Sequence, residues 1–298
     1  MPDYHLYDEW IESEVASAEA EAAKKGKKFN KTSFMVQFKE YTDYSIGFLT
    51  RGCFRKCKFC VNQKYDHVFI HSPLNEFYDP SRNKICLLDD NFLGCPHWKN
   101  MLEELLATGK PFKFKQGMDE RILTDEKCQL LFSGNYDGDY TFAFDNVSDY
   151  DLIHRKLQLI RKYAPFTASI KFYVLVGFEG TGAEDIANAF KRIELLMHYG
   201  CLPYVMRYQD KNYTPWKYSE FKGMYIQLAR WANQPSMFKK QSFRQFCETN
   251  QQFHKSETLC APMRAMRDFE NKCPEIAAQY FDIRYEDYLS EWRTQGNA

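Results

Sequence analysis

The sequence lacks three features that would assign the protein to a membrane, to the cell exterior or to nucleic acid. It has no run of about 18 apolar residues, so no membrane-spanning segment is expected. Its first residues, Met1 to His5, contain no basic region followed by an apolar stretch, which argues against a secretory signal. Lysine plus arginine and aspartate plus glutamate number 40 each, so the chain has no net basic charge. This balance does not support a nucleic-acid partner, although it leaves room for a local basic patch.

Ten cysteines need an explanation. Disulfides would require an oxidising compartment, whereas this chain has no secretory signal and is not small. We therefore expect a cytoplasmic protein whose clustered cysteines bind metal or do redox work and whose scattered cysteines lie in the core. With 44% hydrophobic and 27% charged residues, the chain of 298 residues can bury a sizeable core.

The patterns divide the chain into three segments. Residues 1–43 are expected to form an N-terminal helical appendage, in which acidic residues precede lysines, an order that complements a helix dipole. Residues 44–215 alternate strand and helix patterns and are expected to form an α/β core. Residues 216–298 lose this alternation and are expected to form a C-terminal helical extension. This length suits one large domain with additions.

The α/β core contains six short apolar runs separated by helical patterns. Strands are expected at 44–50, 84–88, 112–116, 140–144, 169–176 and 203–206, and helices at 97–108, 124–132, 150–163 and 183–199. Strands separated by single helices imply parallel pairing with right-handed crossovers. Six such strands predict a partial, TIM-like (β/α)6 barrel, whose working residues lie at the C-terminal ends of the strands.

Three cysteines stand close together directly after the first expected strand. Cys53, Cys57 and Cys60 have the spacing C-x3-C-x2-C. Three thiolates in one loop can bind three irons of a [4Fe–4S] cluster and leave the fourth iron open, as a reactive cluster requires. Cationic neighbours would lower the pKa values of the thiols and offset the negative charge of a cluster. The loop carries four of them: Arg51, Arg55, Lys56 and Lys58.

Two other interpretations of the cysteine loop stay open. The first is a structural zinc site with His67 or His71 as the fourth ligand, although zinc modules typically use paired C-x2-C or C-x2-H units and only one C-x2-C pair is present. The second is a chance cluster of buried cysteines, against which the cationic residues of the loop argue, because they favour exposure.

The segment from Cys53 to Cys60 resembles the CxxxCxΦC signature of the radical S-adenosylmethionine superfamily, with Phe59 as the aromatic residue. The resemblance extends over roughly residues 44–210 and implies a partial (β/α)6 barrel with a [4Fe–4S] cluster on the three cysteines. It also implies that the open iron binds the amino and carboxylate groups of S-adenosylmethionine. An electron from a donor such as flavodoxin or ferredoxin then yields methionine and a 5′-deoxyadenosyl radical, which abstracts a substrate hydrogen.

The resemblance implies a site for the methionine ammonium at the end of the second strand. The family often has Gly-Gly-Glu there, whereas this chain has Asp89, Asp90 and Asn91. This departure is similar to the Asp-Asp variants of the methylthiotransferase-like and cobalamin-type branches, and the three side chains can accept hydrogen bonds from an ammonium. The alternative is that they cap helices and form loop turns.

Further cofactor contacts follow from the same resemblance. Asp145 and Asn146 end the fourth strand and suit the ribose hydroxyls, unless Asp145 only caps the next helix. Gly177 ends the fifth strand and would allow close backbone approach to the adenine. Met206 ends the sixth strand and is expected at the adenine or the substrate, and Arg121 at the methionine carboxylate.

These features predict a radical enzyme that acts on an unidentified substrate, which is an RNA or nucleotide, a peptide or a small molecule. The alternative is a non-catalytic iron–sulfur protein for electron transfer or sensing. Three cysteines without a nearby fourth argue against a closed electron-transfer cluster. Reductive cleavage of S-adenosylmethionine separates the two functions.

Overall fold

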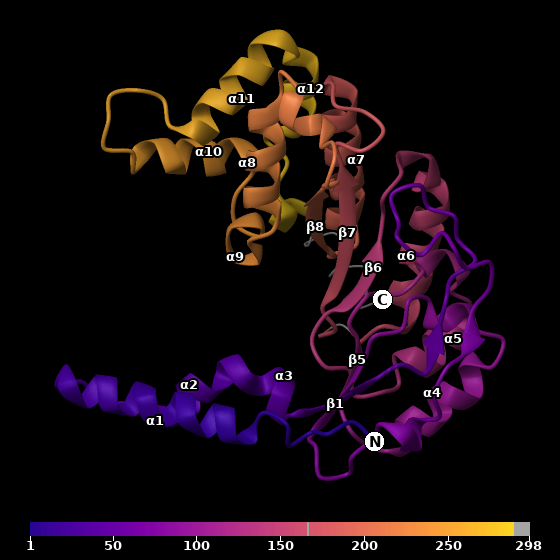
Figure 1. Cartoon of the computed structure of the whole chain (residues 1–298). Coiled ribbons are helices and arrows are strands. Elements are labelled where there is room, and N and C mark those ends of the chain that lie inside the picture. Colours follow the sequence, from indigo (N-terminus) through magenta and orange to yellow (C-terminus); the bar gives the residue numbers. More distant parts are fainter. Residues whose placement is uncertain (166, 289–298) are drawn as a thin grey trace. The chain divides into compact units, whose positions relative to one another are not determined.

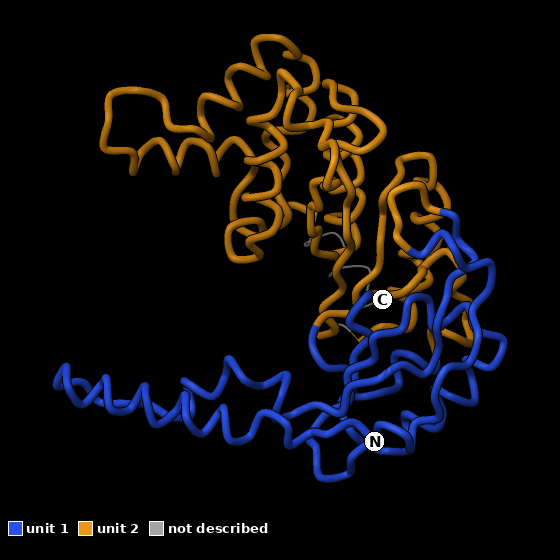
Figure 2. Tube along the Cα trace, viewed as in Figure 1, with its two compact units in different colours: residues 1–56, 62–116, 130–138 blue, residues 57–61, 117–129, 139–298 orange. Residues whose placement is uncertain are grey.

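The structure is a computed structural model that describes residues 1–165 and 167–288, and it is a mixed α/β fold with parallel sheets (Figure 1). Its contacts group the chain into two compact units (Figure 2). The first unit contains residues 1–56, 62–116 and 130–138, and the second contains residues 57–61, 117–129 and the chain from 139 onward. Each unit has one three-stranded parallel sheet.

The sheet of the first unit has the order β1-β4-β5 and is parallel throughout. Its strands are β1 (Tyr44–Gly47), β4 (Lys84–Leu87) and β5 (Phe112–Phe114). Helix α4 (Trp98–Ala107) connects β4 to β5 and buries Leu102 and Leu105. These leucines are three residues apart, so they lie on one face of the helix and cover the sheet. A short antiparallel pair, β2 (Thr50–Arg51) and β3 (Phe69–Ile70), follows β1.

The N-terminal helices of the first unit have a small apolar core of their own. The helices are α1 (Asp8–Lys24), α2 (Lys31–Met35) and α3 (Lys39–Thr42). Ile11, Val15 and Phe38 are buried together, and Phe29, Phe34 and Met35 pack against them. Ile11 and Val15 are four residues apart and therefore form one stripe on an otherwise polar helix.

The sheet of the second unit has the order β6-β7-β8 and is also parallel. Its strands are β6 (Tyr140–Ala143), β7 (Ile170–Val176) and β8 (Leu202–Arg207). The crossovers are α6 (Tyr150–Tyr163) and α7 (Ala183–His198), and α5 (Asp125–Leu131) precedes β6. Every second residue of β7 is buried, which is the period expected of a strand with a helix on one face.

The C-terminal helices of the second unit pack through aromatic side chains. They are α8 (Lys222–Ala232), α9 (Pro235–Phe238), α10 (Phe243–Gln252), α11 (Ala261–Lys272) and α12 (Pro274–Tyr280). The ring of Phe190 on α7 packs against the rings of Trp231, Phe243, Tyr280 and Phe281. This aromatic core anchors the C-terminal helices to α7.

The outer edge of β8 is paired with a side chain instead of another strand. The Asn233 amide follows α8, and its Nδ2 donates to the Val205 carbonyl at 3.0 Å. Its Oδ1 accepts from the Val205 amide at 2.6 Å. One side-chain amide therefore satisfies both backbone groups of a residue in the middle of the edge strand.

The expected α/β class and parallel strands are confirmed, but the TIM-like barrel is not. Within the described ranges the parallel strands form two separate three-stranded sheets, and no closed barrel is found. Strand β5 ends after three residues because the chain turns there, and Gly117 in this turn has φ 88°. No described helix is long and apolar enough to cross a membrane. The predicted boundaries after residues 43 and 215 stay predictions.

Candidate functional site

The cysteine loop follows β2. Cys53, Cys57 and Cys60 are free thiols and are half-buried. Cys53 belongs to the first unit, whereas Cys57 and Cys60 belong to the second. The amide of Cys60 donates to the carbonyl of Cys57 at 2.9 Å, which closes a tight turn between these two residues. Of the seven other cysteines, six are buried and only Cys273 is half-buried, so the loop thiols are set apart by their exposure.

In the first unit, the Cys53 sulfur is approached by two N–H donors. The side-chain Nδ2 of Asn91 lies 3.3 Å from Cys53 Sγ, and the backbone amide of Arg55 lies 3.4 Å from it. Asn91 is buried and follows β4 closely, so the sheet fixes its position. Amide donors of this kind stabilise a thiolate.

Asp89 binds the backbone just before the cysteine loop. Its carboxylate accepts hydrogen bonds from the Thr50 amide at 2.5 Å, from Thr50 Oγ1 at 2.6 Å and from the Leu49 amide at 3.2 Å. Asp89 is only 1% exposed. Burial raises the pKa of Asp89 to about 6, although the hydrogen bonds from Thr50 and Leu49 lower it.

Asp90 binds both sides of the cysteine loop. Its Oδ2 accepts from the Gly52 amide at 3.0 Å, and its Oδ1 accepts from Asn62 Nδ2 at 2.8 Å. The Arg51 guanidinium lies 3.8 Å from Asp90 Oδ2. Gly52 has φ 89°, and a Cβ at this position would come within 2.5 Å of the His67 carbonyl oxygen. The turn into the loop therefore requires glycine.

In the second unit, Arg121 is held by carboxylates and contacts Cys57. Its Nε lies 2.8 Å from Asp119 Oδ1, and its Nη1 lies 3.6 Å from Asp149 Oδ2. Burial raises the pKa of the Cys57 thiol, while the positive charge of Arg121 and its hydrogen bond to the thiol act in the opposite direction. The structure therefore places Arg121 beside a cysteine of the predicted cluster.

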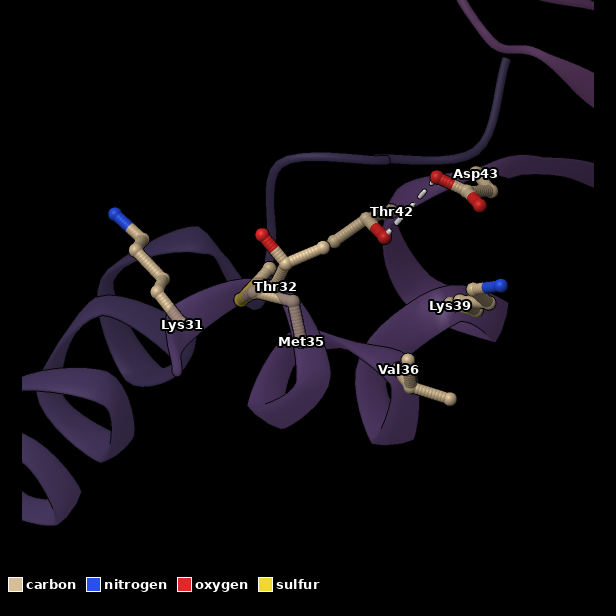
Figure 3. A pocket seen from close by; sticks show the side chains of 7 residues that line it. All are labelled: Lys31, Thr32, Met35, Val36, Lys39, Thr42 and Asp43. Atoms are coloured by element: carbon tan, nitrogen blue, oxygen red, sulfur yellow. Dashed lines mark hydrogen bonds between the residues drawn. The ribbon is translucent and has the colours of Figure 1, made fainter. Parts of the chain in front are cut away.

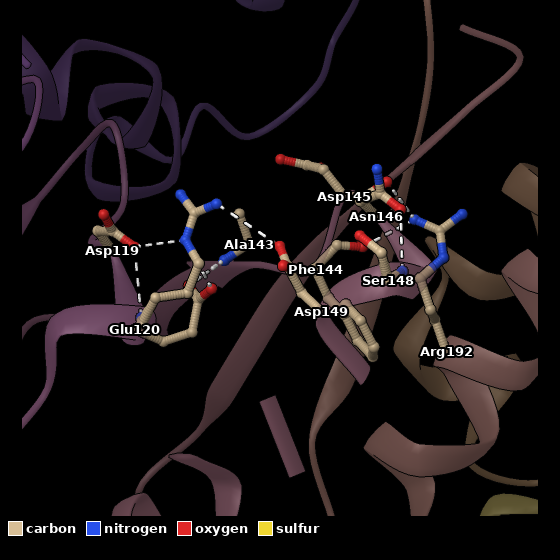
Figure 4. A network of polar contacts seen from close by, with 10 residues as sticks. Asp119, Glu120, Ala143, Phe144, Asp145, Asn146, Ser148, Asp149 and Arg192 are labelled. Atoms are coloured by element: carbon tan, nitrogen blue, oxygen red, sulfur yellow. Dashed lines mark hydrogen bonds and ion pairs between the residues drawn. The ribbon is translucent and has the colours of Figure 1, made fainter. Parts of the chain in front are cut away.

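Glu120 is a buried and Asp145 a half-buried carboxyl group of the second unit (Figure 4). Glu120 Oε2 accepts from the Ala143 amide at 3.0 Å, and burial raises the pKa of Glu120 to about 8. Asp145 Oδ1 accepts from the Leu175 amide at 3.2 Å, so it binds β7 rather than capping the next helix. Burial raises the pKa of Asp145 to about 6, and the nearby charge of Arg192 lowers it.

Arg192 on α7 is a buried cation that no sequence signal had linked to the site. Its guanidinium donates to the carbonyls of Phe144, Asp145 and Leu175 at 2.8 to 2.9 Å. The carbonyls of Phe144 and Asp145 directly follow β6 (Figure 4), and that of Leu175 lies within β7. The sequence does contain a signal that could have identified Arg192. It is a charged residue within the apolar helix face formed by Ala189, Ile193 and Leu196.

The loop after β6 uses Asn146 as a cap. The side chain of Asn146 accepts from the Ser148 amide at 2.9 Å, at the start of the short 3-10 helix Val147–Asp149. This contact matches the helix-capping role that Asx residues commonly play. The predicted contact of Asn146 with a ribose stays a prediction.

The loops after β7 and β8 bring aromatic residues together. The Phe59 and Phe178 rings meet edge to face with centroids 5.6 Å apart, and Phe178 meets Tyr208 at 4.7 Å. Gly177 has φ 71°, and a Cβ there would come within 2.7 Å of Trp216. Met206 is 43% exposed on β8. Two of the predicted cofactor residues, Phe59 and Gly177, therefore lie in or directly beside one aromatic cluster.

The donor set of the loop fits an iron–sulfur cluster in chemistry, because three soft thiols are half-buried within residues 53–60. However, within residues 1–165 and 167–288 the structure contains no group of three or more His, Cys, Asp or Glu side chains that could hold a metal ion. The ring nitrogen of His67 contacts Asp66 at 2.5 Å, and that of His71 contacts Ser72 at 3.0 Å. The ligand set therefore stays a prediction.

A hollow of about 500 Å³ lies among the N-terminal helices of the first unit (Figure 3). Its walls combine two lysines with apolar and hydroxyl side chains; they are Lys31, Thr32, Met35, Val36, Lys39, Thr42 and Asp43. None of the residues predicted to bind a cofactor lines it. Neither cysteine nor histidine is among these seven lining residues.

The chain matches no protein-family model, and no curated protein shows significant similarity to it.

Proposed function

We propose that the protein is a radical S-adenosylmethionine enzyme with a [4Fe–4S] cluster on Cys53, Cys57 and Cys60. The observation that carries the proposal is the C-x3-C-x2-C loop that follows β1 and the short strand β2, with three half-buried free thiols. Four cationic residues accompany these thiols. Soft thiolates next to positive charge are the ligands that iron–sulfur clusters favour.

The order of elements supports the proposal. Six parallel strands occur in the expected positions, and polar or glycine residues follow three of them: Asp89 after β4, Asp145 after β6 and Gly177 after β7. In α/β proteins with parallel strands, functional residues concentrate at the C-terminal ends. We propose the partial (β/α)6 barrel of the radical enzymes as the arrangement of these strands.

When bound, the cluster and S-adenosylmethionine would supply the electron transfer and the 5′-deoxyadenosyl radical. The residues of this chain would bind and shield them. Arg121 donates to Cys57 and offsets thiolate charge. Phe59 and Phe178 offer apolar edges that exclude water, and Gly177 lets the Trp216 side chain pack against the backbone, where a Cβ would come within 2.7 Å of it.

We propose a cytoplasmic enzyme that takes electrons from a donor such as flavodoxin or ferredoxin. Its substrate class is open among an RNA or nucleotide, a peptide and a small molecule. The equal numbers of basic and acidic residues weigh against a large nucleic-acid surface.

The test is reconstitution with iron and sulfide under anaerobic conditions, followed by reduction with dithionite in the presence of S-adenosylmethionine. We expect about four irons per chain, as a [4Fe–4S] cluster requires, and formation of 5′-deoxyadenosine. The triple variant with Cys53, Cys57 and Cys60 changed to alanine should lose both, whereas Cys273→Ala, a matched half-buried cysteine, should lose neither.

Three outcomes would change the proposal. Full cleavage of S-adenosylmethionine by the triple cysteine variant would disprove the proposal. A stable cluster that never cleaves S-adenosylmethionine would favour the non-catalytic iron–sulfur function in electron transfer or sensing. Copurified zinc without a cluster would favour a structural metal site, in which His67 or His71 is the first residue to change.

A further inference from the structure

Three consecutive polar residues follow β4, and all of them contact the cysteine loop. Asp89 accepts from the backbone before Cys53, Asp90 accepts from Gly52 and from the far side of the loop, and Asn91 donates to Cys53 itself. These contacts join residues 28 to 40 positions apart in the chain. They all lie within the first unit, so the positions are set by one compact body.

The two carboxylates are fully engaged by these contacts. Asp89 Oδ1 accepts from the amide and the hydroxyl of Thr50, and its Oδ2 accepts from the Leu49 amide. Asp90 Oδ2 accepts from the Gly52 amide and Oδ1 from the Asn62 side chain. Each of the four carboxylate oxygens therefore already accepts a hydrogen bond from protein.

Burial limits what else these residues can bind. Asp89 is 1% exposed, Asn91 is 2% exposed and the Asp90 side chain is 11% exposed. An ammonium group that replaced the amide donors of Asp89 would leave the backbone N–H groups of residues 49 and 50 without partners. A buried amide without a partner costs about 1–3 kcal/mol, which opposes such a site.

We propose that Asp89, Asp90 and Asn91 form a clamp that positions Cys53, instead of a binding site for the methionine ammonium. Asp89 fixes the backbone at Leu49 and Thr50, Asp90 fixes the Gly52 amide and the Asn62 side chain, and Asn91 is the positioning residue that donates to the Cys53 sulfur. The part of the inference that concerns the cluster rests on the function proposed above. The part that concerns the backbone does not.

The clamp has an electronic consequence for a bound cluster. Negative charge on a ligand sulfur strengthens a hydrogen bond to that sulfur. The hydrogen bond therefore becomes weaker when the cluster loses an electron and stronger when the cluster gains one. Hydrogen bonds to the sulfurs are among the factors that set cluster potentials. Loss of the Asn91 donor should therefore make the cluster harder to reduce.

The first experiment uses the protein without cluster and follows hydrogen exchange of the backbone amides. Asp90→Ala removes the acceptor of the Gly52 amide, so exchange at Gly52 should become at least tenfold faster, while helix α4 keeps its protection. The Asp66→Ala variant, at an exposed position of the same unit, is the control. Unchanged exchange at Gly52 in Asp90→Ala would overturn the backbone part of the clamp.

The second experiment compares Asn91→Leu, which keeps the size of the side chain, with Asn100→Leu, an exposed control in the same unit. The loaded Asn91→Leu protein should shift its reduction equilibrium at least tenfold toward the oxidised cluster, about 59 mV for one electron. The Kd for S-adenosylmethionine should stay within about twofold of wild type.

The opposite pattern would overturn the electronic part of the clamp. An unchanged midpoint potential together with a Kd raised tenfold or more would instead assign Asn91 to the methionine ammonium. If the wild-type protein forms no cluster at all, the proposed function fails, and the exchange experiment on the cluster-free protein still decides the backbone part.

Discussion

Glu120 is a carboxyl group with almost no access to water. It is 2% exposed and accepts the Ala143 amide, and burial raises its pKa to about 8. Because the pKa is higher in the folded state than the ordinary value of 4.5, the folded protein binds this proton more tightly than the unfolded chain does. Glu120 therefore costs no stability below pH 4.5 and an increasing amount as the pH rises to about 8.

We expect Glu120→Gln to remove this cost, because glutamine is neutral at every pH and can keep the acceptor for Ala143. Relative to wild type, the free energy of unfolding should rise by roughly 4 kcal/mol between pH 5 and pH 9. Urea unfolding at both pH values measures it. Glu103→Gln, at an exposed position, controls for the loss of a charge. Parallel pH curves for Glu120→Gln and wild type would contradict the prediction.

The sequence predicted which residue types gather near the cysteines better than it predicted their partners. The spacing of Cys53, Cys57 and Cys60 is a local pattern, so it can be seen without a structure. The hydrogen bonds from Thr50 to Asp89 join positions 39 apart, and nothing local specifies them. The burial that raises the pKa of Glu120 likewise depends on tertiary packing.

At the scale of elements, Arg192 links helix α7 to its sheet. The guanidinium of Arg192 donates hydrogen bonds to three carbonyls that lie within β7 or just after β6. Without these bonds the carbonyls would lack donors. Burial lowers the pKa of Arg192 to about 10, against the effect of Asp185 and Asp145, so it stays charged at neutral pH. The cation therefore fixes how α7 lies across the C-terminal end of β6.

Arg192→Met should destabilise the protein by about 3 kcal/mol, because the apolar side chain fills similar space and leaves those carbonyls without donors. Denaturant unfolding measures the loss. Arg155→Met, at an exposed position of α6, should change stability by less than about 0.5 kcal/mol. A similar loss in both variants would show that the strand-end carbonyls are not what Arg192 satisfies.

Regular elements were predictable because their periodicity is local. The expected helix at 150–163 coincides with α6, and the expected strand at 169–176 differs from β7 by one residue. In the N-terminal helical appendage, helix α1 ends at Lys24, and Gly26 follows with φ 62°. The short pair β2 and β3 was not predicted, because two residues per strand give no alternation to detect.

At the scale of the whole molecule, the ten cysteines fall into two classes. Four are half-buried: Cys53, Cys57, Cys60 and Cys273. The other six are buried, and burial raises the pKa of several of them, including Cys86, Cys128 and Cys247. Buried thiols with raised pKa values react slowly with thiol reagents.

The native protein without cluster should therefore expose four thiols to a disulfide reagent, and a denatured protein all ten. After loading with iron and sulfide, only Cys273 should react quickly, because the other three would be ligands. Mass spectrometry of the labelled peptides identifies them. Rapid labelling of Cys128 or Cys247 in the native state would contradict the packing, and unchanged labelling of the loop after loading would contradict the ligand set.

The sequence predicted three consecutive segments, whereas the compact units combine segments from distant parts of the chain. Such grouping depends on contacts like those of Asp137 in the first unit, which accepts from Tyr44 and Lys84 at 2.6 Å each. The closure of six strands into a barrel is also a long-range property. Local hydrophobic patterns contain neither kind of information.

We expect the side-chain amide of Asn233 to protect the protein against self-association. An unpaired edge strand can template the addition of a second copy, whereas here one side chain occupies both backbone groups of Val205. Pro203, two residues earlier, has no N–H to offer. We expect Asn233→Ala to form turbid, β-rich aggregates on mild warming at concentrations where wild type stays clear, as light scattering would show. Asn233, a single residue at the end of a helix, would then limit the concentration that this protein can reach in a crowded cell without aggregating.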